Sequence, residues 1–169
     1  FLTSAHRATT SHPKALIAPH AGYVYSGPIA GSAYASLDAT SRDKINRVII
    51  LAPAHRVAFR GIAYSSATHF QTPLGLIPVN LSALSLITDL PMVTKNNEAF
   101  QDEHSIEVHL PFLQEILDEF SIVPLLVGEA SAEQVATVLE QLWGGSETLV
   151  VISSDLSHYL DYESARKTV

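Results

Sequence analysis

The sequence predicts an α/β fold with a mostly parallel or mixed central sheet and helices on both faces. Three observations lead to this prediction. Short apolar runs alternate with helical patterns along the chain, which is typical of α/β proteins. Several of these runs are almost continuously apolar, as expected of parallel strands that are covered on both faces. The length of 169 residues fits one domain that buries its own core.

The elements of the first half follow in a regular order. Residues 14–20 (KALIAPH) and 47–55 (RVIILAPAH) are predicted to be buried strands, and residues 26–37 between them form a helix of small residues. Residues 61–80 contain several Gly and Pro residues between short runs in which apolar and polar residues alternate. This pattern favours a hairpin or edge strands. Residues 81–90 (LSALSLITDL) predict a further helix.

The second half continues the alternation. An amphipathic helix is predicted over residues 104–120, with Pro111 inside it or at a break. Ser131 is placed to cap the start of another helix. The remaining predicted elements are a strand over residues 121–128, the capped helix over residues 131–143, a strand over residues 148–153 that runs into a loop, and a helix that begins at residue 161.

Composition narrows the class of protein. The net charge is -7 and the basic residues do not cluster, so neither nucleic acid nor an anionic membrane is an expected partner. The absence of cysteine excludes disulfides and thiolate ligands. Because no signal segment or long apolar run is present, we expect a cytoplasmic protein. Residues 1–13 are expected to be an arm or an internal start, and residues 14–169 a single domain truncated at its C-terminus.

Metal-ligating side chains follow three of the predicted strands. His20 follows the first strand, His55 follows the second, and Asp155 and His158 follow the last. Open α/β sheets bind ligands outside the carboxyl ends of their strands, so neighbouring parallel strands would bring these groups together. Imidazole and carboxylate ligands suit Fe(II), Zn, Mn or Cu(II). We therefore expect one divalent metal ion at this edge of the sheet.

A second group of polar residues lies in the block DEHSIEVHLP, residues 102–111. His104 and Glu107 are three residues apart and would share one face of a helix. A histidine among carboxylates suits proton transfer, so we expect His104 to act as an acid or base and Glu107 to orient it. Three further residues are expected to line the pocket: Tyr23, Asp102 and Ser157.

Each candidate also has an ordinary structural interpretation. Asp155 would cap the turn after its strand, as aspartate often does. His158 would be a loop residue, and Tyr23 would pack beside the glycine turn rather than line a pocket. We expect His109 to pack against the core. The remaining histidines are interpreted as surface residues: His6, His12 and His69.

Six blocks in this order resemble the Memo-like family, whose bacterial and archaeal members are called AmmeMemoRadiSam system protein B. The blocks are LIAPHAGYVYSGPIAGSAY, VIILAPAHRV, QTPLG, DEHSIEVHLPFL, IVPLLVG and VISSDLSHY. The resemblance implies a fold similar to the class III extradiol ring-cleaving dioxygenases, which use non-haem Fe(II). It also implies that His20 and His55 are metal ligands and that His104 corresponds to the acid/base histidine.

The last block departs from the family pattern. Animal members carry a cysteine at the position of Ser157, and this departure leaves Asp155, His158 or water to complete the metal site. The resemblance therefore implies the site but not its third ligand.

Three functions remain open. The favoured one is a metal-binding oxidoreductase of the dioxygenase type, with Fe(II) as the metal, Zn or Cu as alternatives, and a phenolic small molecule as substrate. The second is a non-catalytic signalling or docking module that binds a metal or a peptide. The third is a zinc-dependent hydrolase. A shared fold does not carry a reaction with it, so the residues leave the physiological reaction unassigned.

Overall fold

The fold is α/β, as predicted, with one mixed six-stranded sheet. The structure is a computed structural model that describes residues 1–3, 5, 12–155, 157 and 159–168. The strand order is β1-β8-β2-β7-β3-β6. The first four strands in this order are parallel, whereas β3 runs antiparallel to β7. Their bounds are β1 (Ala15–Ala18), β8 (Thr148–Ser153), β2 (Arg47–Pro53), β7 (Ser121–Val127), β3 (Ile62–Tyr64) and β6 (Val93–Lys95).

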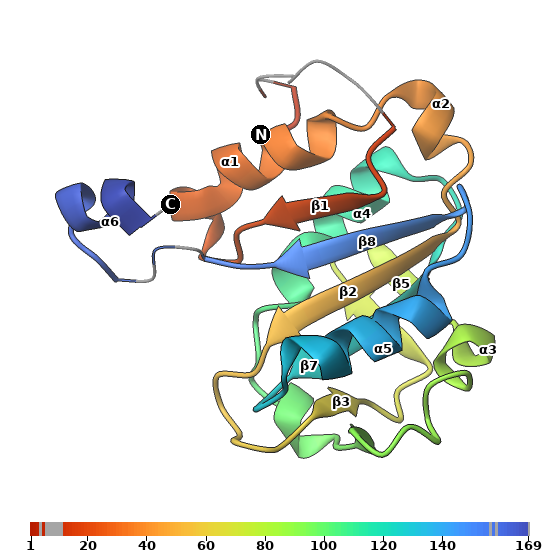
Figure 1. The fold of residues 1–169 in the computed structure, drawn as a ribbon. Helices are drawn as coiled ribbons and strands as arrows, with labels where there is room; N and C mark the ends of the chain where they lie inside the picture. The colour runs from red at the N-terminus through yellow and green to blue at the C-terminus, as the bar shows by residue number, and fades with distance from the viewer. Residues whose placement is uncertain (4, 6–11, 156, 158, 169) are drawn as a thin grey trace.

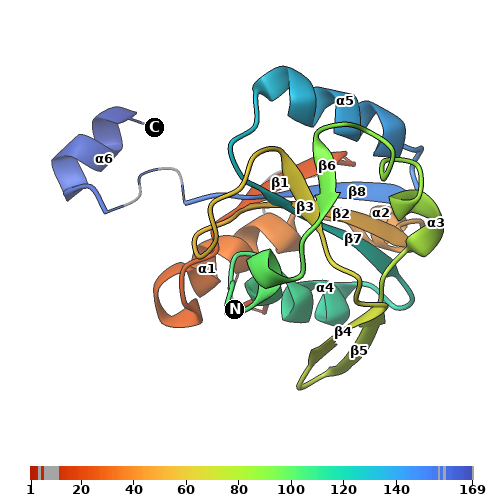
Figure 2. The same ribbon diagram turned by 90° about the horizontal axis from the view of Figure 1, so that it is seen from below.

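Helices lie on both faces of the sheet (Figures 1 and 2). Figure 2 shows α5 (Ala132–Leu142) on one face, with α1 (Tyr23–Ala35) and α4 (Leu110–Ile116) on the other. Within the described part of the chain, no helix combines the length and the apolar character needed to cross a bilayer. The remaining elements are α2 (Ala39–Arg42), α3 (Leu81–Leu84), α6 (Tyr162–Thr168), the 3-10 helices η1 (Glu98–Phe100) and η2 (Glu107–His109), and a hairpin of β4 (His69–Thr72) and β5 (Gly75–Pro78).

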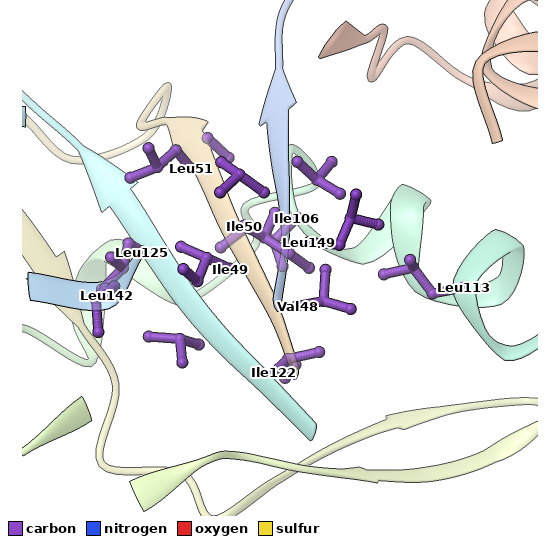
Figure 3. Packing of buried hydrophobic residues seen from close by; sticks show 14 of the residues in the cluster. Val48, Ile49, Ile50, Leu51, Ile106, Leu113, Ile122, Leu125, Leu142 and Leu149 are labelled. Atoms are coloured by element: carbon purple, nitrogen blue, oxygen red, sulfur yellow. The ribbon is translucent and has the colours of Figure 1, made fainter. Parts of the chain in front are cut away.

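The core lies on both sides of the central strands. Val48, Ile49 and Ile50 are consecutive on β2 and all are fully buried, because their side chains point alternately to opposite faces of the sheet. Figure 3 shows Leu142 of α5 and Leu113 of α4 among the residues packed around these strands. The continuous apolar runs in the sequence are therefore explained by burial on both faces.

Two of the predicted helices are shorter than expected. The helix predicted over residues 81–90 ends at Leu84, where the hydroxyls of Ser85 and Thr88 bond to backbone carbonyls and compete with further helical turns. The helix predicted over residues 104–120 begins only at Leu110. Pro111 lies in its first turn, where a missing backbone N–H is tolerated.

Candidate metal centre

The carboxyl ends of β1 and β2 bring His20 and His55 together. Their ring centroids are 5.2 Å apart, and the ring planes are inclined by 60°. Two imidazoles that bind one ion through bonds of about 2.1 Å place their centroids roughly 5 Å apart. The separation of the two rings is therefore compatible with a shared metal ion.

His20 is held by two residues at the end of β8, the strand between β1 and β2. Its Nδ1 lies 2.7 Å from the hydroxyl oxygen of Ser153, and that hydroxyl donates its own hydrogen to the backbone carbonyl of Ser105 at 2.7 Å. Because a hydroxyl has one hydrogen, Ser153 accepts from His20, and Nδ1 carries the ring proton. The other ring nitrogen, Nε2, lies 3.6 Å from Oδ2 of Asp155.

Asp155 also binds the backbone of His20. Its Oδ1 accepts a hydrogen bond from the His20 backbone N–H at 2.9 Å. Asp155, which follows the neighbouring strand β8, therefore lies beside both the backbone and the ring of His20. Two ligands of one ion are separated by roughly 3 to 3.5 Å, so the Nε2-to-Oδ2 distance is close to the spacing that an ion between them needs.

His55 is held by Glu103. The backbone N–H and Nδ1 of His55 donate to the two carboxylate oxygens at 2.6 and 3.0 Å. The backbone N–H of Ser105 donates to the same carboxylate at 3.0 Å. The Glu103 side chain is only 4% exposed. Because an ionised carboxylate only accepts, Nδ1 of His55 is the donor, and in the neutral ring the lone pair is then on Nε2.

The charge on Glu103 depends on these hydrogen bonds. Burial raises the pKa of Glu103, but the hydrogen bonds from His55 and Ser105 outweigh burial and lower the pKa to about 2. Glu103 therefore stays ionised over the physiological range and acts as a permanent acceptor for His55.

His104 and Glu107 form a separate pair on the surface. Nδ1 of His104 lies 2.5 Å from Oε1 of Glu107, and both side chains are more than half exposed. The two residues meet as the spacing predicted, but His104 lies in a loop and Glu107 begins a 3-10 turn, so a regular helix does not position them. The loop forms because backbone and side-chain groups of Ser105 bond to Glu103 and Pro53 instead of to a helix.

The three predicted pocket residues have different surroundings. Asp102 has an exposed side chain and a left-handed backbone (φ 55°), and its carbonyl accepts from Arg56 at 3.1 Å. Tyr23 packs edge-on against Phe112, and its hydroxyl donates to the carbonyl of Val108 at 3.1 Å. Ser157 is partly buried in the loop after β8.

The candidate metal site also involves the loop that follows β8. Over the residues that the structure describes, no group of three or more His, Cys, Asp or Glu side chains is placed to hold a metal ion. His158, a predicted ligand, lies outside these residues, as does His6. Of the predicted ligands, the structure describes His20, His55 and Asp155, and Asp155 lies beside His20.

His109 is structural in its contacts, as predicted. It is fully buried, and its Nδ1 lies 2.9 Å from the hydroxyl of Tyr34 on α1. Burial and, to a smaller extent, the nearby charge of His20 together lower the pKa of His109 to about 4, against the opposing effect of Asp155. His109 is therefore neutral at physiological pH. His12 and His69 are exposed, as expected.

Three residues of the site were not predicted from the sequence. Glu103, Ser105 and Ser153 hold the two histidines, although the prediction chose Asp102 and Glu107 from the same acidic block. Glu103 could have been found, because it lies in that block beside His104. Nothing local distinguishes Ser105 and Ser153 from other serines, since their role depends on contacts 48 residues apart in the sequence.

Acid is expected to destabilise the metal-free protein in two overlapping pH ranges. His109 has a folded pKa of about 4 against an ordinary 6.5, so its contribution is complete above pH 6.5 and is lost as the pH falls towards 4. Glu103 has a folded pKa of about 2 against 4.5, so its contribution is present above pH 4.5 and is lost as the pH falls towards 2. Urea unfolding at several pH values tests the contribution of Glu103. In a Glu103→Gln variant, the free energy of unfolding should depend less steeply on pH than in the wild type, and only below pH 4.5.

Glu98→Gln is the exposed control and should follow the wild type. A Glu103→Gln curve that runs parallel to the wild type throughout would contradict the assignment.

Comparison with known proteins identifies the family. The model of the Memo-like protein family matches residues 1–168. A MEMO1 family protein of Thermotoga neapolitana is 35% identical over 161 residues, covering 92% of this chain and 57% of that protein. One from Aquifex aeolicus is also 35% identical, covering 92% and 58%. Protein MEMO1 of Rattus norvegicus is 32% identical, covering 90% and 53%. The chain spans about half the length of the curated relatives it matches, and it belongs to the Memo-like family.

Proposed function

We propose that this chain carries the histidine pair of a metal-dependent protein in which His20 and His55 hold one divalent ion. The observation that supports the proposal is that both Nδ1 atoms bond to acceptors while the rings lie 5.2 Å apart. This leaves the lone pair of each ring on Nε2, the nitrogen that would bind the ion. Histidines that bind a metal through one ring nitrogen usually donate the N–H of the other nitrogen to an acceptor of this kind.

Asp155 or His158 completes the site in this proposal, and Asp155, whose Oδ2 lies 3.6 Å from Nε2 of His20, is the one of the two that the structure describes. Two histidines and one carboxylate with open positions is the donor set of non-haem Fe(II) oxygenases. Fe(II), when bound, would supply redox chemistry towards dioxygen. The chain's own contribution would be to orient the ion and to move protons at His104, whose Nδ1 is held by Glu107. A phenolic small molecule is the substrate class that this reaction type implies.

Metal content after anaerobic purification tests the proposal. Mass spectrometry should find about one metal ion per wild-type chain, and the His20→Ala/His55→Ala double variant should lose it. The matched control is His12→Ala/His69→Ala, which removes two exposed histidines and should retain the metal. Asp155→Asn should weaken binding but not abolish it.

The identity of the metal then separates the reactions. Iron supports the dioxygenase-type function, whereas preferential retention of zinc with hydrolysis of an ester or amide would favour the hydrolase. A wild-type chain that cannot be loaded with iron, zinc or copper would contradict the metal site and leave the docking function.

A further inference from the structure

Ser105 uses every one of its polar groups in hydrogen bonds around the site. Its backbone N–H donates to Glu103 at 3.0 Å, and its carbonyl accepts from Ser153 at 2.7 Å. Its hydroxyl donates to the carbonyl of Pro53, the last residue of β2, at 2.8 Å. The residue is 1% exposed, so water does not compete for these bonds.

These bonds connect the two histidines through one residue. Nδ1 of His20 bonds to Ser153, Ser153 bonds to Ser105, Ser105 bonds to Glu103, and Glu103 bonds to Nδ1 of His55. The two ends of this series of bonds, His20 and His55, follow different strands, β1 and β2, which are not direct neighbours in the sheet. Ser105 itself contacts neither imidazole in these bonds.

The acceptors decide which nitrogen of each ring can bind a metal. A neutral imidazole has one proton, and the nitrogen that lacks it has the lone pair. An acceptor held at Nδ1 keeps the proton there and leaves Nε2 for a ligand bond. If the acceptors shifted, the proton could move to Nε2, and the ring would no longer bind an ion through that atom.

We infer that Ser105 is a positioning residue that sets the tautomer of both His20 and His55 through Ser153 and Glu103. Its hydroxyl anchors the loop to the end of β2, and its backbone then holds one acceptor for each ring. The tautomers are a property of the metal-free protein. The consequence for metal affinity rests on the proposed function.

Nitrogen-15 NMR of the histidine side chains in metal-free protein tests this inference. Two-bond correlations distinguish the Nδ1–H from the Nε2–H tautomer, and the His20→Ala and His55→Ala variants identify the two signals. At a pH above the ordinary histidine pKa, both wild-type rings should be Nδ1–H tautomers. Ser153→Ala should change only His20, and Glu103→Ala should change only His55.

The decisive variant is Ser105→Ala, which touches neither ring. It should increase the Nε2–H population of both histidines and lower the affinity for Co(II) roughly 10- to 100-fold, measured by competition with a chelator. Ser36→Ala is the matched control, because it also removes a hydroxyl-to-carbonyl bond but lies at the far end of α1. Ser153→Thr, which keeps the hydroxyl, should restore the His20 tautomer that Ser153→Ala loses.

The outcomes separate the two proposals. Wild-type rings in the Nε2–H form, or a folded Ser105→Ala protein with both signals unchanged, would overturn the inference even if metal binds. Expected tautomer changes in a protein that binds no metal would instead overturn the proposed function and leave the positioning role intact. Thermal melting of each variant checks folding, and if Ser105→Ala is unfolded, the separate effects of Ser153→Ala and Glu103→Ala still test the two acceptors.

Discussion

Replacing Leu125 with alanine is expected to destabilise the fold by about 2 to 5 kcal/mol. Leu125 is fully buried on β7, which lies between β2 and β3 in the sheet. Figure 3 shows its side chain among the packed residues of the core. Truncation removes apolar contacts and leaves a cavity that the rigid surrounding strands cannot close. Urea unfolding should show a lower midpoint with an unchanged slope.

Leu76→Ala is the matched control for this change. Leu76 is 65% exposed on the β4–β5 hairpin, so the same truncation should change the free energy of unfolding by less than about 0.5 kcal/mol. Equal losses in the two variants would mean that Leu125 does not lie in a tightly packed core.

Replacing Gly61 with alanine is expected to cost at least about 2 kcal/mol of stability. Gly61 has a φ of 84°, and an added Cβ would lie 2.2 Å from the carbonyl oxygen of Met92. That oxygen accepts the hydrogen bond from Ile62 at 2.8 Å where β3 begins to pair with β6. Alanine would therefore strain its own backbone and also push away a neighbouring backbone group.

Gly75→Ala separates these two causes. Gly75 also has a positive φ, 133°, but the atom nearest to its added Cβ is 3.9 Å away. In Gly75→Ala, the loss in the free energy of unfolding should therefore come from backbone strain alone. Gly75→Ala should melt at a higher temperature than Gly61→Ala. If Gly61→Ala is the milder of the two, the close approach of Met92 does not limit stability.

Most of the sheet could be predicted because its central strands carry strong sequence patterns. The apolar runs of β2, β7 and β8 indicate strands buried on both faces, and the structure confirms all three. The start of α5 was predictable because Ser131 and Gln134 form a capping box. The strand β6 was not predicted, since its three residues, Val93–Lys95, are too few to show a period.

The arrangement of the candidate site was predictable only in part. His20, His55 and Asp155 follow strands whose parallel order brings their ends together, and this could be inferred from position alone. Their role as metal ligands stays a proposal. The acceptors for the two rings depend on the path of the loop around Ser105, where tertiary hydrogen bonds prevail over the helical pattern of the sequence. The helix propensity of the local sequence does not reveal where such tertiary hydrogen bonds replace helical ones.

The pairing of β1 with β8 has a consequence for when the proposed metal site can form during synthesis. The backbone N–H of His20 and the carboxylate of Asp155 are 135 residues apart in the chain, and their bond closes a very long loop. A nascent chain on the ribosome has both histidines long before it has Ser153 or Asp155. Contacts of such high sequence separation form slowly, so ion capture would follow the completion of the sheet rather than guide it.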